Sequence, residues 1–244
     1  MVDRAAVGAC LHRLFIAAEE TRLRREDEKK VDELRGFLAL LDKRVSKRAV
    51  VVDAAAGKSP LGLVAVELLS LTRLVVIERD PARAAACRDA VTRLSRRAAV
   101  EVRCGDVADD ASWPAKVDVV VALHACGAAS DAVFEAAVRR AAKWIVVAPC
   151  CYADSVPFSA RAHAMVEAMG AAGHAAVRRQ LVQGLIDADR TLMLEAAGYE
   201  VTVAPFVAPT VTPHHLAWIA RRTLEPRAMA AAAERRARLC PPCL

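Results

Sequence analysis

The chain has 244 residues, of which 55% are hydrophobic and only 4% aromatic, and it carries a formal net charge of +6. This length can bury one good-sized core, whereas two full domains would both be small. The apolar content is mostly Ala, Val and Leu, which suits buried Val-rich strands that alternate with Ala-rich helices. The composition therefore favours an α/β fold.

Charged or turn residues interrupt every apolar stretch before it reaches signal-peptide or membrane-spanning length. We therefore expect a soluble, cytoplasmic protein with no membrane partner. Eight cysteines in such a chain predict reduced thiols rather than a disulfide framework. Only Cys240 and Cys243 have CxxC spacing, with no second pair and no histidine pair nearby, so no metal site is expected.

The positive charge is compatible with a nucleic-acid partner, because Lys and Arg neutralise phosphates. The arginines are spread along the chain, however, and Arg on solvated helix faces would give the same net charge. The charge alone leaves both interpretations open.

The first half of the chain predicts helices followed by strand and helix units. Apolar residues at spacings of three and four predict one or two helices over residues 5–41. Residues 49–57 and 74–81 are apolar runs that end in an acid and turn residues, which is typical of buried parallel strands. Residues 59–70 and 82–97 have the patterns of the helices that follow these strands.

The alternation continues through the second half. Three more strands with their loops are predicted over residues 98–107, 117–127 and 143–151. The helix over residues 130–142 has Ser130 or Asp131 as its predicted N-cap. A longer helical stretch covers residues 159–197 with a break at 170–174.

Two final strands, over residues 199–207 and 215–222, can pair as an antiparallel hairpin. Strand and helix units that end in a hairpin describe a doubly wound, mostly parallel, seven-stranded sheet. The expected organisation is a helical extension over 1–44, one α/β domain over 45–224 with a helical insertion at about 157–198, and a C-terminal helix and tail over 225–244.

The turn after the first predicted strand runs from Asp53 through three alanines to Gly57, and small residues let backbone N–H groups approach a ligand closely. It lacks the GxGxxG spacing of dinucleotide sites and the GxxxxGK[ST] spacing of phosphate-cradling loops. The turn therefore suits the carboxylate of an amino acid better than a pyrophosphate.

Suitable polar residues also follow the next three strands. Glu78 lies about 25 positions after Asp53, near the offset at which an acid reaches ribose hydroxyls. Asp106 can accept a hydrogen bond from an adenine amino group while Val107 packs on the ring. Because the carboxyl ends of parallel strands meet at one edge, these turns and residues 123–127 are expected to form one site.

These motifs, VVDAAAGKSPLG, VVIERDP, CGD, and DVVVALHACGAASD followed by VAPCCY, resemble those of class I S-adenosylmethionine (SAM) methyltransferases, which have a Rossmann-like fold. More narrowly, they resemble a group with an L-H-x-C-G motif after the fourth strand and a Cys-Cys pair after the fifth. That group includes methyltransferase-like proteins of unassigned substrate, the methyltransferase domain of a glutathione-transferase-C-terminal-like protein and, more distantly, eukaryotic tRNA 2′-O-ribose methyltransferases. The match covers residues 29–222 and departs at the first turn, where AAAGKSP replaces GAGKG.

The resemblance implies SAM as the cofactor and RNA, either tRNA or rRNA, as the methyl acceptor. The cofactor-binding residues that it implies are Asp53, Ala55, Gly57, Glu78, Asp106, Val107 and Leu123. His124 and Cys126 are the candidate catalytic residues near the sulfonium and the substrate.

A hydroxyl acceptor needs a base, and His124 is the best-placed candidate because an imidazole titrates near neutrality. The alternative is that His124 only holds its turn together. Cys126, Cys150 and Cys151 are interpreted as small wall residues rather than as zinc ligands or nucleophiles. Tyr152 could stack on a flat substrate or lie at the rim of the site.

Residues outside these motifs are weaker candidates. Arg190 lies on a predicted helix that could roof the site, where Asp187 and Asp189 could pair with it or with substrate, but we favour a plain solvated helix face. His214 and His215 are interpreted as residues that border the substrate opening. Two other functions remain open: methylation of a small molecule or protein side chain, and SAM binding without turnover by a scaffold protein. A NAD-dependent oxidoreductase is disfavoured by the missing glycine motif.

Overall fold

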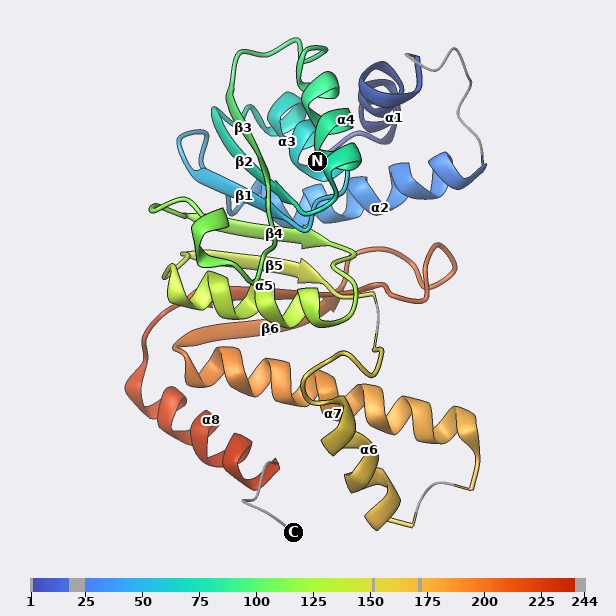
Figure 1. Cartoon of the computed structure of the whole chain (residues 1–244), viewed down its shortest axis with the longest axis vertical. Coiled ribbons are helices and arrows are strands. Elements are labelled where there is room, and N and C mark those ends of the chain that lie inside the picture. Colours follow the sequence, from blue (N-terminus) through green and yellow to red (C-terminus); the bar gives the residue numbers. More distant parts are fainter. Residues whose placement is uncertain (1, 18–24, 151, 171–172, 240–244) are drawn as a thin grey trace.

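The computed structural model describes residues 2–17, 25–150, 152–170 and 173–239, and its centre is one β-sheet (Figure 1). The strands are β1 (Val50–Ala54), β2 (Arg73–Glu78), β3 (Ala99–Cys104), β4 (Val119–Leu123), β5 (Trp144–Ala148), β6 (Tyr199–Pro205) and β7 (Leu216–Arg222). Their order in the sheet is β3-β2-β1-β4-β5-β7-β6. The first five strands are parallel, and β7 is antiparallel to both of its neighbours. The predicted Rossmann-like, doubly wound sheet with a C-terminal hairpin is therefore confirmed.

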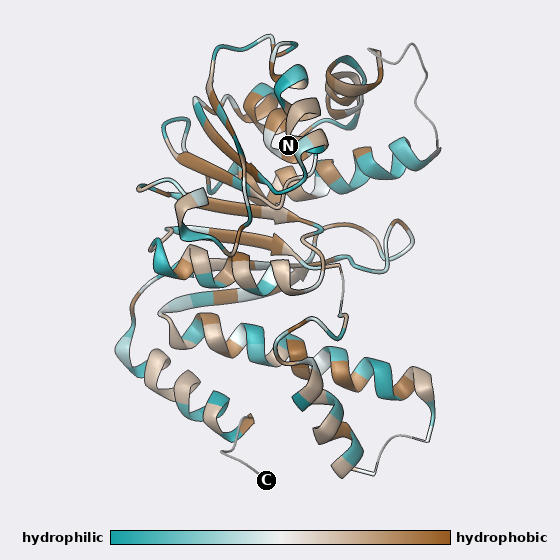
Figure 2. Cartoon of the chain, viewed as in Figure 1, coloured by the Kyte–Doolittle hydropathy of each residue, from teal (hydrophilic) through white to brown (hydrophobic). Residues whose placement is uncertain are grey.

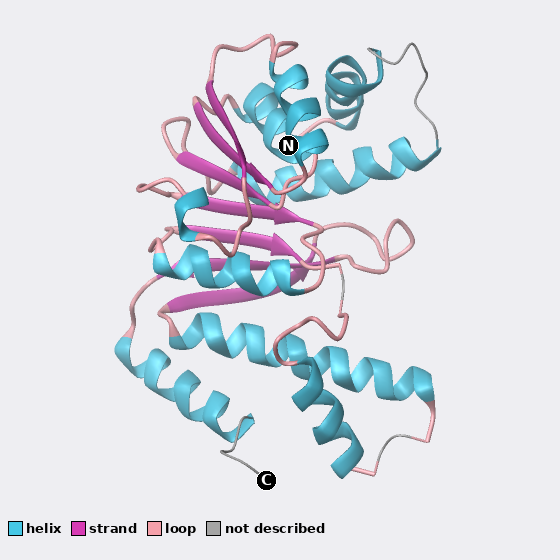
Figure 3. Cartoon of the chain, viewed as in Figure 1, coloured by secondary structure: helices cyan, strands magenta, loops and turns pink. Residues whose placement is uncertain are grey.

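Helices cover both faces of this sheet (Figure 3). The α-helices are α1 (Arg4–Leu11), α2 (Arg25–Asp42), α3 (Pro60–Leu69), α4 (Pro81–Val91), α5 (Ala128–Arg139), α6 (Ser159–Ala168), α7 (Ala175–Ala196) and α8 (Pro226–Leu239). A π-helix, η1 (His12–Ile16), extends α1, and a short 3-10 helix, η3 (Asp110–Ser112), lies between β3 and β4. Within the described ranges, no helix is both long enough and apolar enough to cross a membrane.

The central strands are hydrophobic because helices bury both faces of the sheet, whereas the edge strands β3 and β6 carry exposed polar residues (Figure 2). Val51 and Val121 contribute to a core that contains residues of α1 to α4, whereas their neighbours Val52 and Val120 contribute to a core with α5 and α7. This alternation follows from the two-residue period of a β-strand. A smaller third core joins α6 to α7.

The polar turns gather at one end of the sheet because the five parallel strands point the same way. Figure 3 shows the connections that leave the tips of β4 and β5 at the same end as the long loop between β6 and β7. Open parallel sheets bind ligands at this end. The parallel arrangement of the strands therefore brings the predicted turns to the same end of the sheet.

One predicted helix start is wrong. α5 begins at Ala128 directly after Gly127, whose φ is 58°, so Ser130 and Asp131 lie in the first turn and not at the N-cap. Gly127 takes this position because a positive φ is accessible to glycine at little cost. Asp131 is thereby left to form an ion pair with Arg190.

Candidate functional site

Six of the nine predicted site residues line one cavity at the carboxyl ends of β1 to β4. They are Ala55, Glu78, Asp106, Val107, His124 and Cys126. Arg79, Arg83, Gly105 and Ala129 complete its wall. We call this the strand-end cavity. Its volume is about 130 Å³, which is smaller than the ~300–1,000 Å³ that encloses a whole drug-sized ligand, so it can receive one end of a larger molecule.

Asp53 lies beneath the first turn, only 2% exposed, and does not line the strand-end cavity. Its Oδ2 accepts hydrogen bonds from Ser59 Oγ at 2.6 Å and from Gly62 N at 3.0 Å. A Cβ on Gly62 would lie 2.9 Å from that same oxygen, so the turn requires glycine there. Burial raises the pKa of the Asp53 carboxyl to about 7. In this structure Asp53 shapes the turn from below.

Gly57 and Leu123 also lie outside the cavity wall. Gly57, with a φ of 60°, donates its N–H to Glu78 Oε2 at 2.6 Å, so it positions the acid of the neighbouring strand. Leu123 ends β4 and packs against the core on the α1 to α4 side. Both residues therefore hold the cavity wall in place from behind and do not form part of its surface.

Glu78 is an acid of the strand-end cavity whose two carboxylate oxygens are both held by backbone N–H groups. It is 5% exposed, and its two oxygens accept from different backbone groups, Oε2 from Gly57 N and Oε1 from Asp80 N at 2.9 Å. A carboxylate has about four lone-pair sites, so each oxygen can accept one more hydrogen bond. This geometry suits a pair of vicinal hydroxyls.

The wall after β3 combines an apolar surface with a carboxylate. Val107 is 5% exposed, and its carbonyl is fixed by Trp113 Nε1 at 2.9 Å. Asp106 is exposed, and its Oδ1 accepts from Ala108 N at 2.9 Å. A flat ring on Val107 with a donor toward Asp106 fits this wall, because the carboxylate is held at its edge.

Glu33, which lies on α2 and reaches His124, is a site residue that the sequence motifs do not reveal. His124 Nε2 is 3.1 Å from Glu33 Oε2, and Lys30 Nζ is 3.2 Å from the same oxygen. Burial acts to raise the pKa of Glu33, but the hydrogen bond with His124 and the charge of Lys30 lower it overall. Glu33 is therefore an ionised carboxylate that orients the imidazole.

Two backbone features bring Glu33 and His124 together. His124 has a φ of 66°, which directs its side chain away from the line of β4. On α2, Gly36 lies so close to the loop after β6 that a Cβ would be 1.9 Å from the Phe206 carbonyl oxygen. No local sequence pattern predicts the contact between Glu33 and His124. The only signal was that the resemblance began at Lys29, on this same helix.

Cys126 lies beside Cys150 from the end of β5, with the two Sγ atoms 2.8 Å apart. Cys126 Sγ also lies 3.4 Å from the carbonyl of His124. Among the described residues, no group of three His, Cys, Asp or Glu is arranged to hold a metal ion. Cys151, Cys240 and Cys243 lie outside the described residues.

The prediction that Arg190 belongs to a solvated helix face is wrong. Arg190 is 1% exposed and forms a bidentate pair with Asp131, at 2.9 and 2.8 Å. Asp187 accepts from the Tyr152 hydroxyl at 2.9 Å, and burial raises the pKa of Asp187 to about 6. Asp189 pairs with Arg236 of α8 at 2.8 Å. These contacts join α7 to α5, to the segment after β5 and to α8, which a helical pattern alone cannot reveal.

His214 and His215 lie in the loop between β6 and β7, as the sequence predicted. Burial lowers the pKa of His214, and the nearby His124 and His215 lower it further.

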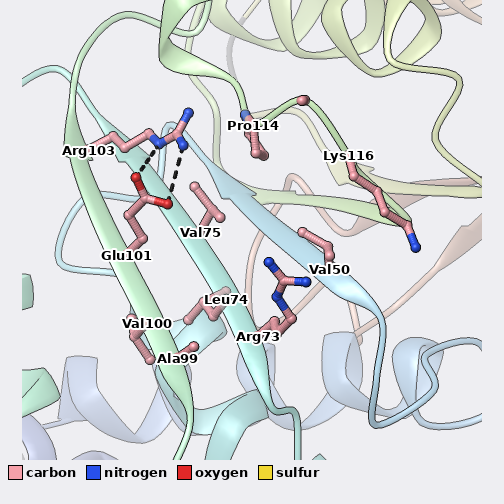
Figure 4. Close-up of a pocket in the computed structure, with 11 residues that line it drawn as sticks. Val50, Arg73, Leu74, Val75, Ala99, Val100, Glu101, Arg103, Pro114 and Lys116 are labelled. Carbon is pink, nitrogen blue, oxygen red and sulfur yellow. Dashed lines mark hydrogen bonds and ion pairs between the residues drawn. The ribbon is translucent and has the colours of Figure 1, made fainter.

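A larger cavity of about 410 Å³ lies elsewhere on the sheet (Figure 4). It is lined by the first halves of β1 to β3, including Val50 and Arg73, and by the loop at Lys116. The short η3, in place of a full helix between β3 and β4, leaves this part of the sheet face open. Figure 4 shows its main polar feature, the pair between Arg103 and Glu101. No predicted site residue lines it.

Comparison with known proteins identifies the family. A protein family described as "Methyltransferase domain" matches residues 28–155, a little over half of the chain, and the chain belongs to this family. The chain is also 27% identical over 192 residues to the Glutathione S-transferase C-terminal domain-containing protein homolog of Drosophila pseudoobscura pseudoobscura. That alignment covers 68% of this chain but 32% of the relative, so the chain spans about a third of that protein's length.

Two solved methyltransferases share the fold. The SAH-bound methyltransferase of Podospora anserina has a TM-score of 0.53 at 12% identity, covering 89% of this chain and 88% of that chain. Magnesium protoporphyrin IX methyltransferase from Synechocystis PCC 6803 with bound SAH has a TM-score of 0.51 at 12% identity, covering 91% of this chain and all of that chain. The chain therefore belongs to the methyltransferase-domain family and shares the fold of these two SAH-bound methyltransferases.

Proposed function

We propose that this methyltransferase transfers a methyl group from SAM to a hydroxyl of RNA. The observation that carries the proposal is the meeting of three features at one cavity: the acid Glu78, the apolar wall at Val107 with Asp106 at its edge, and His124 with its partner Glu33. The first two suit a nucleoside, and the third suits proton removal from an acceptor.

The residues of the strand-end cavity fit the adenosine part of SAM. Glu78 has lone pairs left for the two ribose hydroxyls, and Asp106 with Val107 fits the adenine ring and its amino group. Ala55, in the first turn, lines the same cavity, and we assign this turn to the methionine part of SAM. When bound, SAM supplies the activated methyl carbon, so the protein needs chiefly to position the acceptor and exclude water.

His124 and Glu33 supply the base that a hydroxyl acceptor needs. With Nε2 donating to Glu33 at 3.1 Å, the ring keeps Nδ1 as its proton acceptor. Nδ1 would take the proton of an acceptor O–H whose oxygen attacks the methyl group, and S-adenosylhomocysteine would be the leaving group. The ionised Glu33 then stabilises the imidazolium that forms. An acceptor that is already nucleophilic would not need this pair.

RNA is the acceptor that the charge and the resemblance support. The chain has a net charge of +6, and its motifs resemble a group that extends to tRNA 2′-O-ribose methyltransferases. Ribose hydroxyls also match the base chemistry of the Glu33 and His124 pair.

The test is transfer of tritium from methyl-labelled SAM to total RNA, with and without ribonuclease. We expect ribonuclease-sensitive label with wild type, a loss of ~10²- to 10⁴-fold in His124→Gln, and a smaller loss in Glu33→Gln. Calorimetry with S-adenosylhomocysteine should show the same affinity in all three proteins, which separates catalysis from cofactor binding.

Two outcomes would contradict the proposal in different ways. Label in protein or small-molecule fractions alone would replace RNA with another acceptor. Cofactor binding with no transfer to any fraction would favour a scaffold protein. A matched control is Glu101→Gln, because Glu101 is a carboxylate on β3 that pairs with Arg103 outside the strand-end cavity, and it should leave transfer unchanged.

A further inference from the structure

A second hollow lies beside the strand-end cavity, between α7, the residues after β5 and the loop between β6 and β7. It consists of two cavities of about 510 and 300 Å³ that share Tyr152, Arg179, Gln183 and His214. We call the two together the α7 cleft. Its combined size is enough for more than one nucleotide-sized group, since small-ligand sites occupy ~300–1,000 Å³.

The α7 cleft adjoins the reacting end of the strand-end cavity. Cys126 of the strand-end cavity lies with its Sγ 2.8 Å from that of Cys150, which comes two residues before Tyr152, a residue that lines both parts of the cleft. A ligand in the cleft would therefore lie next to the proposed base.

The cleft has the charge of an anion site. Arg178 and Arg179 lie on the exposed first half of α7 and line it. Its carboxylate, Asp187, is already engaged, because Oδ2 accepts from the Tyr152 hydroxyl and Oδ1 lies 3.6 Å from Arg190 Nη1. The guanidinium groups are thus the charges that the cleft offers to a ligand.

The cleft also has a held aromatic surface. The rings of Tyr152 and His214 lie with their centroids 6.4 Å apart and their planes tilted by 33°. Tyr152 is fixed by its hydrogen bond to Asp187 and by Arg190, whose guanidinium carbon lies 5.4 Å from the ring centroid. A side chain held in this way loses little freedom when a flat group stacks on it.

We propose that the α7 cleft binds a single-stranded segment of the RNA acceptor, with a base on Tyr152 and His214 and phosphates on Arg178 and Arg179. The inference rests on the proposed function. Aromatic faces combined with a positive groove are typical of single-strand binding, whereas a paired duplex keeps its base faces covered. Gln180 and Gln183 supply amides that can reach the edge of the base.

The test measures fluorescence anisotropy of a short fluorescein-labelled oligouridylate, without cofactor, at several salt concentrations. In the double variant Arg178→Ala with Arg179→Ala, the slope of log affinity against log salt should fall by about 1.4, since each phosphate contact on a single strand contributes ~0.7. Tyr152→Ala should bind roughly tenfold more weakly, while Tyr152→Phe, which keeps the ring, should bind nearly as wild type.

The matched control is the double variant Arg227→Ala with Arg238→Ala. Both arginines are exposed on α8, which packs on the second half of α7, so this variant loses the same charge away from the cleft. Equal weakening by both double variants, unchanged binding by the cleft variant, or no binding by wild type would overturn the proposal. If Tyr152→Ala fails to fold, His214→Ala tests the second ring and should also weaken binding.

The failure of the proposed function would look different. RNA that binds in the cleft but receives no methyl group would refute RNA methylation and leave the cleft as an RNA site. Methyl transfer to RNA that is unaffected by the cleft variants would refute the cleft and leave the enzyme.

Discussion

The strand-end cavity and the α7 cleft lie side by side, but they are built in different ways. The strand-end cavity is formed by turns of a few residues, each directly after a parallel strand, so the topology of the sheet brings them together. The α7 cleft depends on contacts between distant segments, such as Arg190 with Asp131, which are 59 positions apart. The first site is therefore encoded in local motifs, and the second in long-range packing.

The largest expected effect is on the packing of the cleft. Arg190→Ala should lower the free energy of unfolding by about 3–5 kcal/mol, because it removes a buried cation and leaves the half-buried carboxylates of Asp131 and Asp187 without it. Urea denaturation measures this. In Arg221→Ala, which breaks an exposed pair with Glu200, the change should stay within about 1 kcal/mol. Similar values for both variants would show that Arg190 does not anchor α7.

Two carboxyls have a raised pKa, Asp53 beneath the strand-end cavity at about 7 and the half-buried Asp187 of the α7 cleft at about 6, against 3.8 for a free Asp. The folded state then holds a proton that the unfolded chain has released, so these groups make stability fall as pH rises from ~4 through the folded pKa. Asp53→Asn should flatten that fall up to about pH 7, and Asp187→Asn only up to about pH 6. Urea denaturation across this pH range tests both. An Asp53→Asn profile parallel to that of wild type would contradict the raised pKa.

The smallest effects come from two helical glycines. Gly36→Ala places a Cβ against the Phe206 carbonyl oxygen, so α2 must shift. We expect the free energy of unfolding to fall by ~1–3 kcal/mol, and methyl transfer to slow because Glu33 on the same helix moves. A Cβ added to Gly184 on α7 would meet no atom within 4 Å, so Gly184→Ala should stabilise by up to ~1 kcal/mol. Thermal unfolding of both variants decides. A harmless Gly36→Ala would mean that α2 is not held close to this loop.

Much of the fold could be predicted from the sequence, because Val-rich runs and helical spacings specify each element locally. The same holds for Glu78, Asp106 and His124, since each follows a strand directly and parallel strands end together. Glu33 could not be found in this way, because its contact with His124 depends on where α2 crosses the end of the sheet.

Arg190 was misjudged for a related reason. Its spacing on α7 resembles that of a surface arginine, and its burial is favourable because Asp131 in the first turn of α5 and Asp187 on α7 both pair with it. The wrong N-cap prediction for α5 concerned this same Asp131, because a carboxylate in a first turn can serve either a backbone N–H or a distant cation. Sequence patterns do not distinguish these two uses.

The most direct test of the account is to measure two ligands on two variants, S-adenosylhomocysteine by calorimetry and labelled oligouridylate by anisotropy. Glu78→Ala should lose the cofactor product and still bind RNA, whereas Arg178→Ala with Arg179→Ala should weaken RNA binding and keep the cofactor product. Loss of one ligand by each variant, with the other ligand still bound, is the result expected of two adjoining sites formed by different residues. A variant that loses both ligands while still folded, or one that loses neither, would contradict the division of the molecule into a strand-end cavity for the donor and an α7 cleft for the acceptor.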